Sequence, residues 1–131
     1  MTPELVALAL AGLMHVAQFA VASYMANKDL GPGYTTSPRD RPPSREMRRV
    51  TARMLRAYDN HAAMIGVFAA AVACIAIPGQ STGWTAFLAF LYLAARAAYI
   101  PAYALGWQPW RSFLWLTALA ACVLLFLAAL I

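Results

Sequence analysis

The sequence contains few charged residues and few of the patterns that carry enzyme chemistry. Charged side chains make up 11% of the 131 residues, against about a quarter in an average soluble protein. Only two cysteines are present, Cys74 and Cys122, both in apolar runs. Without a CxxC or Cys/His spacing, neither a disulfide framework nor a zinc site is expected. No acid pair suited to glycosidase chemistry, nucleophile with a spaced base, Gly-rich phosphate loop or metal-ligand cluster is present either.

Apolar residues dominate instead. They make up 63% of the chain, and the mean hydropathy is +0.61. A chain of this length forms a single domain, whose small core cannot hide so much apolar surface from water. The excess must therefore face lipid, which indicates an integral membrane protein.

Four apolar stretches predict four membrane-spanning helices, at about residues 3–26, 46–77, 84–105 and 109–131. The first begins with Thr2-Pro3-Glu4, a good helix start, and we expect a span rather than a cleaved signal peptide because no basic segment precedes it. Breaker-rich residues 28–45 form a loop, and two short turns join the later spans. The predicted fold is all-α: one transmembrane domain, residues 1–131, folded as an antiparallel up-down four-helix bundle.

The basic residues predict the orientation. Most of them lie between the first two spans or at the start of the second, Arg111 lies in the loop on the same side, and the turn at 78–83 has none. The positive-inside rule therefore places residues 28–45 in the cytoplasm and both termini outside. Because the net charge of +5 is concentrated in this way, we expect a membrane lipid surface as the partner and no nucleic acid.

Polar residues inside the predicted spans form two stripes. Arg49, Arg53, Arg56 and Asn60 follow one another at steps of four, three and four on the second helix, and Tyr92, Arg96, Tyr99 and Tyr103 do so on the third. Such spacing puts each set on one helical face.

The two stripes are expected to meet. At 1.5 Å per residue, Asn60 and Tyr99 lie at a similar depth, roughly 25 Å from the external turn. Arg111 and Ser112 open the fourth helix near the same level. We therefore predict a polar site just below the cytoplasmic interface, suited to a carboxylate- or phosphate-bearing molecule.

Simpler explanations compete at several positions. The outer arginines of the second helix can snorkel to the interface and contact anionic lipid. Asp59 is spaced to pair with Arg56 at i,i+3. For His15, near Gln18, an interhelical hydrogen bond is expected rather than ligand binding, and for His61 a packing role, because it points about 100° away from the arginine stripe.

The motifs Arg53-x-x-Arg56-Ala57-x-x-Asn60 and Arg96-x-x-Tyr99-x-x-x-Tyr103 resemble those of the MAPEG family, membrane-associated proteins in eicosanoid and glutathione metabolism. The stretch from Tyr92 to Ser112 and the loop GPGYTTSPRDRPP are similar to the small bacterial branch. The resemblance covers nearly the whole chain.

The resemblance implies a homotrimer in a bacterial inner (cytoplasmic) membrane, with glutathione bound between subunits near the cytoplasmic face and a larger membrane complex as a further option. By this analogy Arg111 and Ser112 are catalytic and stabilise the thiolate. The implied cofactor-binding residues are Arg53, Arg56, Asn60, Arg96, Tyr99 and Tyr103. The implied activity is a glutathione-dependent transferase or peroxidase acting on lipophilic electrophiles.

Two departures from the family pattern keep a second function open. The family motif continues Asn-x-x-Glu, whereas this chain has Ala63, and Gln18 and Phe19 occupy the region where a basic residue is often found. Loss of the acid predicts weakened glutathione binding. The alternative is a non-catalytic membrane subunit or lipid-binding scaffold that retains the fold.

Overall fold

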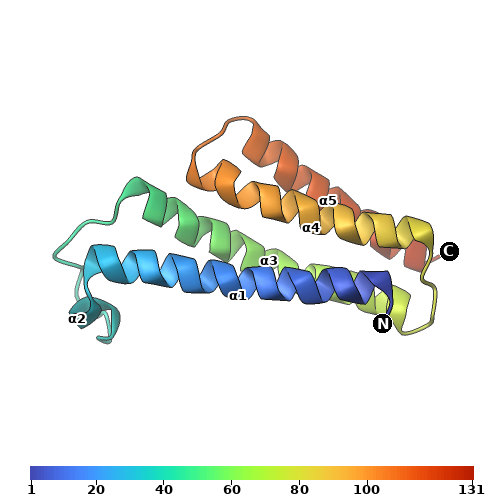
Figure 1. Ribbon diagram of the computed structural model, residues 1–131, viewed down its shortest axis with the longest axis horizontal. Coiled ribbons are helices and arrows are strands. Elements are labelled where there is room, and N and C mark those ends of the chain that lie inside the picture. Colours follow the sequence, from blue (N-terminus) through green and yellow to red (C-terminus); the bar gives the residue numbers. More distant parts are fainter.

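Four long helices make up most of the protein. A computed structural model describes all residues, 1–131, and contains no strands (Figure 1). The helices are α1 (Pro3–Leu30), a single turn α2 (Pro32–Thr35), α3 (Arg49–Ala76), α4 (Gly83–Ala104) and α5 (Trp110–Ala129). The long helices lie within a few residues of the four predicted spans. The differences are that α1 continues four residues further, that α3 starts three residues later, and that the loop contains α2.

Local sequence explains several of the helix ends. The Thr2 side chain accepts a hydrogen bond from the Leu5 amide at 3.4 Å, and α1 ends at Gly31, whose φ of 87° is available to glycine without strain. α4 begins with a capping box, in which the Thr82 amide donates to Thr85 Oγ1 at 2.8 Å and the Thr85 amide donates to Thr82 Oγ1 at 3.2 Å.

The helices form two antiparallel hairpins, α1 with α3 and α4 with α5, and both termini lie at one end of the molecule (Figure 1). Every pair of long helices is in contact except α1 and α5, which therefore lie diagonally opposite. The shared core consists mostly of small and aliphatic side chains with Phe68 and Tyr92 stacked 3.9 Å apart. Small residues allow such close helix approach.

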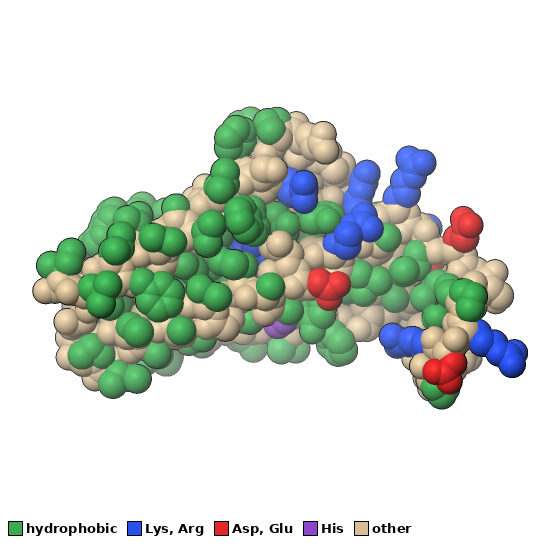
Figure 2. Space-filling view, turned by 180° about the vertical axis from the view of Figure 1, so that it is seen from behind, with side chains coloured by type: hydrophobic (Ala, Val, Ile, Leu, Met, Phe, Trp, Pro, Cys, Tyr) green, Lys and Arg blue, Asp and Glu red, His purple; other side chains and the backbone are tan.

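The outside of the bundle is strongly apolar. Only 25 of the 131 residues are buried, and large hydrophobic side chains such as Leu13, Phe113 and Leu127 are about half exposed or more. All four long helices have the length and hydropathy to cross a membrane. Green side chains cover the half of the surface near the termini, while charged ones gather toward the other end (Figure 2). The predicted all-α, four-helix membrane fold is confirmed.

A buried carboxylate joins three segments near the termini. Glu4 is fully buried in the first turn of α1 and accepts hydrogen bonds from Ser81 Oγ at 2.8 Å and Thr85 Oγ1 at 2.5 Å. The bonds connect the start of α1 to the turn between α3 and α4 and to the first turn of α4. Hydrogen bonding offsets the cost of burying this acid.

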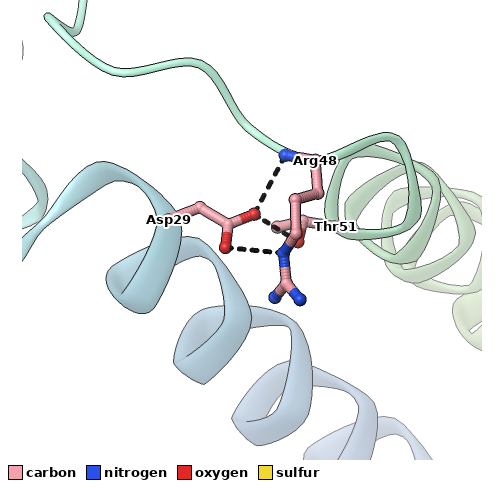
Figure 3. Close-up of polar contacts among 3 residues, drawn as sticks. All are labelled: Asp29, Arg48 and Thr51. Atoms are coloured by element: carbon pink, nitrogen blue, oxygen red, sulfur yellow. Dashed lines mark hydrogen bonds and ion pairs between the residues drawn. The ribbon is translucent and has the colours of Figure 1, made fainter.

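The opposite end, which we call the basic end, contains residues 31–48 and 105–109. Here the Asp29 carboxylate on α1 accepts hydrogen bonds from the Arg48 amide (3.0 Å), Arg48 Nε (2.9 Å) and Thr51 Oγ1 (2.6 Å) (Figure 3). Arg48 itself provides no side-chain cap for α3. Asp29 thus serves as the N-cap from a neighbouring helix, and α3 begins where that carboxylate can reach it.

Candidate functional site

A polar pocket lies among α3, α4 and α5 toward the basic end. It has a volume of about 360 Å³ and is lined by Asn60, Tyr99, Arg111, Ser112, Trp115 and Leu116. This volume falls within the range of small-molecule sites, about 300–1,000 Å³. Four of the eight residues named as site candidates from sequence therefore share one pocket. Each comes from the helix on which the sequence placed it.

A pair of tyrosines on α4, Tyr99 and Tyr103, is flanked by arginine side chains. Tyr99 and Tyr103 meet edge to face, with ring centroids 5.6 Å apart. The Arg96 guanidinium carbon lies 4.6 Å from the Tyr99 centroid, and that of Arg111 lies 4.9 Å from the Tyr103 centroid. Both distances are typical of cation–π contacts. The tyrosines therefore contact one arginine that lines the pocket, Arg111, and one that does not, Arg96.

Arg56 contacts the same tyrosine pair from α3. Its Nε donates to Tyr103 Oη at 3.1 Å, and its guanidinium carbon lies 5.9 Å from that ring. It does not line the pocket itself. The pairing with Asp59 considered from the sequence is absent, because the chain's only ion pair joins Arg48 and Asp29.

Arg53 lies beside the end of α4 rather than in the pocket. Its Nη1 approaches the Ala104 carbonyl oxygen at 3.4 Å, in the last turn of that helix. A cation at a helix C-terminus interacts favourably with the carbonyl ends. The structure therefore gives Arg53 a helix-capping contact.

Arg96 lies behind the pocket wall. Its side chain is 1% exposed, and Nη1 donates to Asn60 Oδ1 at 3.0 Å. Asn60 and Tyr99 line the pocket and also contact Arg96. The guanidinium can act on a bound anion through these two side chains without touching it.

The charge balance of this region is strongly positive. Arg56, Arg96 and Arg111 approach the tyrosine pair, and none forms an ion pair with a carboxylate. In a poorly hydrated setting, charge-assisted hydrogen bonds to an anion are stronger than neutral ones. The positive charge around the pocket therefore favours an anionic group over a cationic one.

Two lining residues, Trp115 and Leu116, were not among the site candidates. Both were within reach of sequence analysis, because they follow Arg111 and Ser112 by four residues and therefore lie on the same face of α5.

The histidines take packing positions. His61 is buried, and its Nδ1 bonds Gln18 Oε1 at 2.6 Å between α3 and α1. His15 stacks on the Tyr58 ring at 4.6 Å, and its Nδ1 has no hydrogen-bond partner in the protein. The interhelical hydrogen bond expected of His15 is thus made by Gln18 and His61.

A second, larger pocket of about 750 Å³ lies among α1, α2 and the loop that follows. Seven of its twelve lining residues are hydrophobic, and its one cation, Arg39, donates to the Thr35 carbonyl oxygen at 2.9 Å. It lacks the converging arginine and tyrosine side chains of the smaller pocket.

Comparison with known proteins agrees with the motifs. The model of the MAPEG family matches residues 4–131. No curated protein and no solved structure matches the chain significantly. A match over nearly the whole length, to a chain whose four long helices can cross a membrane, shows that this protein belongs to the MAPEG family.

Proposed function

We propose that this protein binds glutathione in the pocket at the basic end and uses it to attack lipophilic electrophiles or peroxides. The observation that carries the proposal is the convergence of Arg56, Arg96 and Arg111 on two tyrosines with no carboxylate among them. Family membership supplies the identity of the anion, because MAPEG proteins are associated with glutathione.

The lining residues offer partners for a carboxylate and for the neutral polar groups of a short peptide. Arg111 offers a guanidinium for a charge-assisted bond to a carboxylate. Asn60, Tyr99 and Ser112 add an amide and two hydroxyl groups that can donate or accept. Tyr99 is held by the Arg96 guanidinium and the Tyr103 ring, so its hydroxyl needs little ordering when a ligand binds.

When bound, glutathione supplies a thiol whose ionised form is the nucleophile. Arg111 and Ser112 provide the positive charge and the hydroxyl donor that favour the ionised sulfur. Trp115 and Leu116 give the pocket an apolar side on α5. Next to them lies exposed apolar surface such as Phe113, over which a membrane-dissolved substrate can approach.

Assembly and orientation form part of the same proposal. We expect a homotrimer, because MAPEG proteins are typically trimers. Ser112, which lines the pocket, is exposed in the single chain, so a second subunit can complete the site there. We place the basic end in the cytoplasm of a bacterial inner membrane, with both termini outside, because most Lys and Arg residues lie at that end or in the helix turns next to it. Native mass spectrometry from detergent that shows only monomer or dimer would contradict the trimer.

The test is a glutathione titration of the detergent-purified protein, with Arg111→Ala and with Arg49→Ala as the control. Arg49 is an exposed arginine at the start of α3 without a side-chain contact to the pocket. Losing one charge-assisted contact costs about 1.5–3 kcal/mol. Arg111→Ala should therefore weaken binding by roughly 10- to 150-fold, and Arg49→Ala should not. Tight binding that both variants retain would place the ligand elsewhere.

A second function is favoured by Ala63, where the family motif has glutamate. If that acid normally holds the glutathione amine, wild type should bind weakly and Ala63→Glu should bind more tightly. If neither form binds, the chain is a non-catalytic membrane subunit or lipid-binding scaffold.

A further inference from the structure

Arg96 is an unpaired charge in the middle of the bundle. Its side chain is 1% exposed, and only Nη1 has a protein partner, Asn60 Oδ1. Nε and Nη2 of Arg96 are buried without one, and so is the hydroxyl of Tyr92, one turn earlier on the same face of α4. Three hydrogen-bond donors on consecutive turns thus lack acceptors.

The chain has no carboxylate left to balance this charge. Glu4 is bonded to Ser81 and Thr85 near the termini, and Asp29 is bonded to Arg48 and Thr51. The other three acids, Asp40, Glu46 and Asp59, have exposed side chains and form no ion pair. An arginine side chain stays protonated in proteins. The countercharge must therefore come from outside the chain.

An uncompensated charge buried in a membrane-spanning bundle is strongly unfavourable. A second copy of the chain cannot supply the missing carboxylate, because Arg96 is covered by its own helices. A large ligand in the neighbouring pocket does not reach it either, since Asn60 and Tyr99 line that pocket and Arg96 does not. These limits leave a small ion.

We infer that a small monovalent inorganic anion, of about the size of chloride, binds in the core against Arg96 Nε and Nη2 and the Tyr92 hydroxyl. The Tyr92 ring stacks on Phe68 at 3.9 Å, which fixes the direction of its hydroxyl. Two histidine rings lie nearby as well. The ring centroid of His61 is 6.4 Å from that of Tyr92, and the ring centroid of His15 is 4.8 Å from that of His61.

The two histidines offer hydrogen-bond acceptors on this side of the proposed anion. Gln18 Oε1 accepts from His61 Nδ1, so the buried Nε2 of His61 has a lone pair, and Nδ1 of His15 is also unpaired. A water bound to the anion can donate to such a nitrogen, and a buried water typically makes about three hydrogen bonds. This site lies beside the pocket proposed for glutathione, and Arg96 contacts two residues that line that pocket, Asn60 and Tyr99.

The test is thermal unfolding of the detergent-purified protein at constant ionic strength, with sodium gluconate replaced stepwise by sodium chloride or bromide. An ion that binds only the folded state raises its stability in a saturable way. Wild type and the control Arg49→Met should gain several degrees in Tm, and Arg96→Met should gain none. Equal halide dependence in wild type and Arg96→Met, or no dependence in wild type, would overturn the site.

A second measurement covers the case in which Arg96→Met does not fold. Crystals of the wild-type protein grown in bromide should show an anomalous peak within hydrogen-bonding distance of Arg96 Nε or Nη2. Ordered water alone at that position, with no anomalous signal, would show that water rather than an anion accepts the hydrogen bonds of Arg96 and Tyr92, and would overturn the proposal.

Discussion

The hydrogen bond between Gln18 and His61 gives a direct measure of how much buried polarity stabilises this bundle. The two side chains are 5% and 1% exposed and meet at 2.6 Å between α1 and α3. Gln18→Leu removes the acceptor and leaves His61 Nδ1 unpaired. An interhelical bond in a membrane is worth about 0.6 kcal/mol on average and up to about 1.7, while an orphaned buried donor costs about 1–3 kcal/mol. We therefore expect a loss of roughly 1–2 kcal/mol.

The double variant Gln18→Leu/His61→Phe tests the reasoning. Each single change should destabilise, because each leaves one polar partner unpaired, whereas replacing both with apolar groups can be nearly neutral. The free energies of unfolding come from reversible SDS titrations of the detergent-solubilised protein, followed by circular dichroism. Gln80→Leu, in the exposed turn after α3, is the control and should lie within about 0.5 kcal/mol of wild type. Single-variant effects that simply add in the double variant would refute the proposed coupling.

Three further predictions concern the loops. Gly79 and Gly106 both follow helix ends, with φ of 74° and 69°. Gly79→Ala should cost about 1–2 kcal/mol from backbone strain alone. Gly106→Ala should cost a similar amount in the same SDS titration, because its Cβ would meet only the flexible end of Arg53, Nη1 at 2.9 Å, which can shift. Asp29→Ala should speed amide hydrogen exchange in the first turn of α3, whereas Asp40→Ala, which changes an exposed acid without an ion pair, should not. Equal exchange in both variants would show that Asp29 does not cap α3. A cysteine introduced at exposed Thr36, in a Cys74→Ser background, should react with a membrane-impermeant thiol reagent only after the cytoplasmic face has been made accessible. Labelling of this cysteine on intact cells would show that the orientation is the opposite of the predicted one.

The fold could be predicted largely from sequence because lipid imposes a simple requirement. Four apolar runs separated by Gly and Pro leave few arrangements other than four helices. The exact ends of the helices were harder to predict from the sequence. Residues Asn27, Lys28 and Asp29 are polar and indicate a loop, yet they continue α1. The start of α3 depends on Asp29, a residue on another helix, and no local pattern in α3 reveals that contact.

The sequence predicted those parts of the candidate site that helical periodicity determines. Asn60, Tyr99, Arg111 and Ser112 share a pocket because equal depth and one face per helix suffice to bring them together. Periodicity does not distinguish a side chain that lines a pocket from one that lies behind it. The burial of Arg96 and the contact of Arg53 with Ala104 depend on how long side chains thread between helices, which only the packed structure shows.

The bonds of Asp29 to Arg48 and Thr51 also determine how the intervening loop can vary. The two points that the loop connects are already held together by this carboxylate, so the loop does not have to set the spacing of α1 and α3. Lengthening it then costs mainly closure entropy, about 0.6 kcal/mol for each doubling. The exposed stretch around Arg41 and Pro42 is therefore a place where an inserted epitope should leave the register of the two helices unchanged.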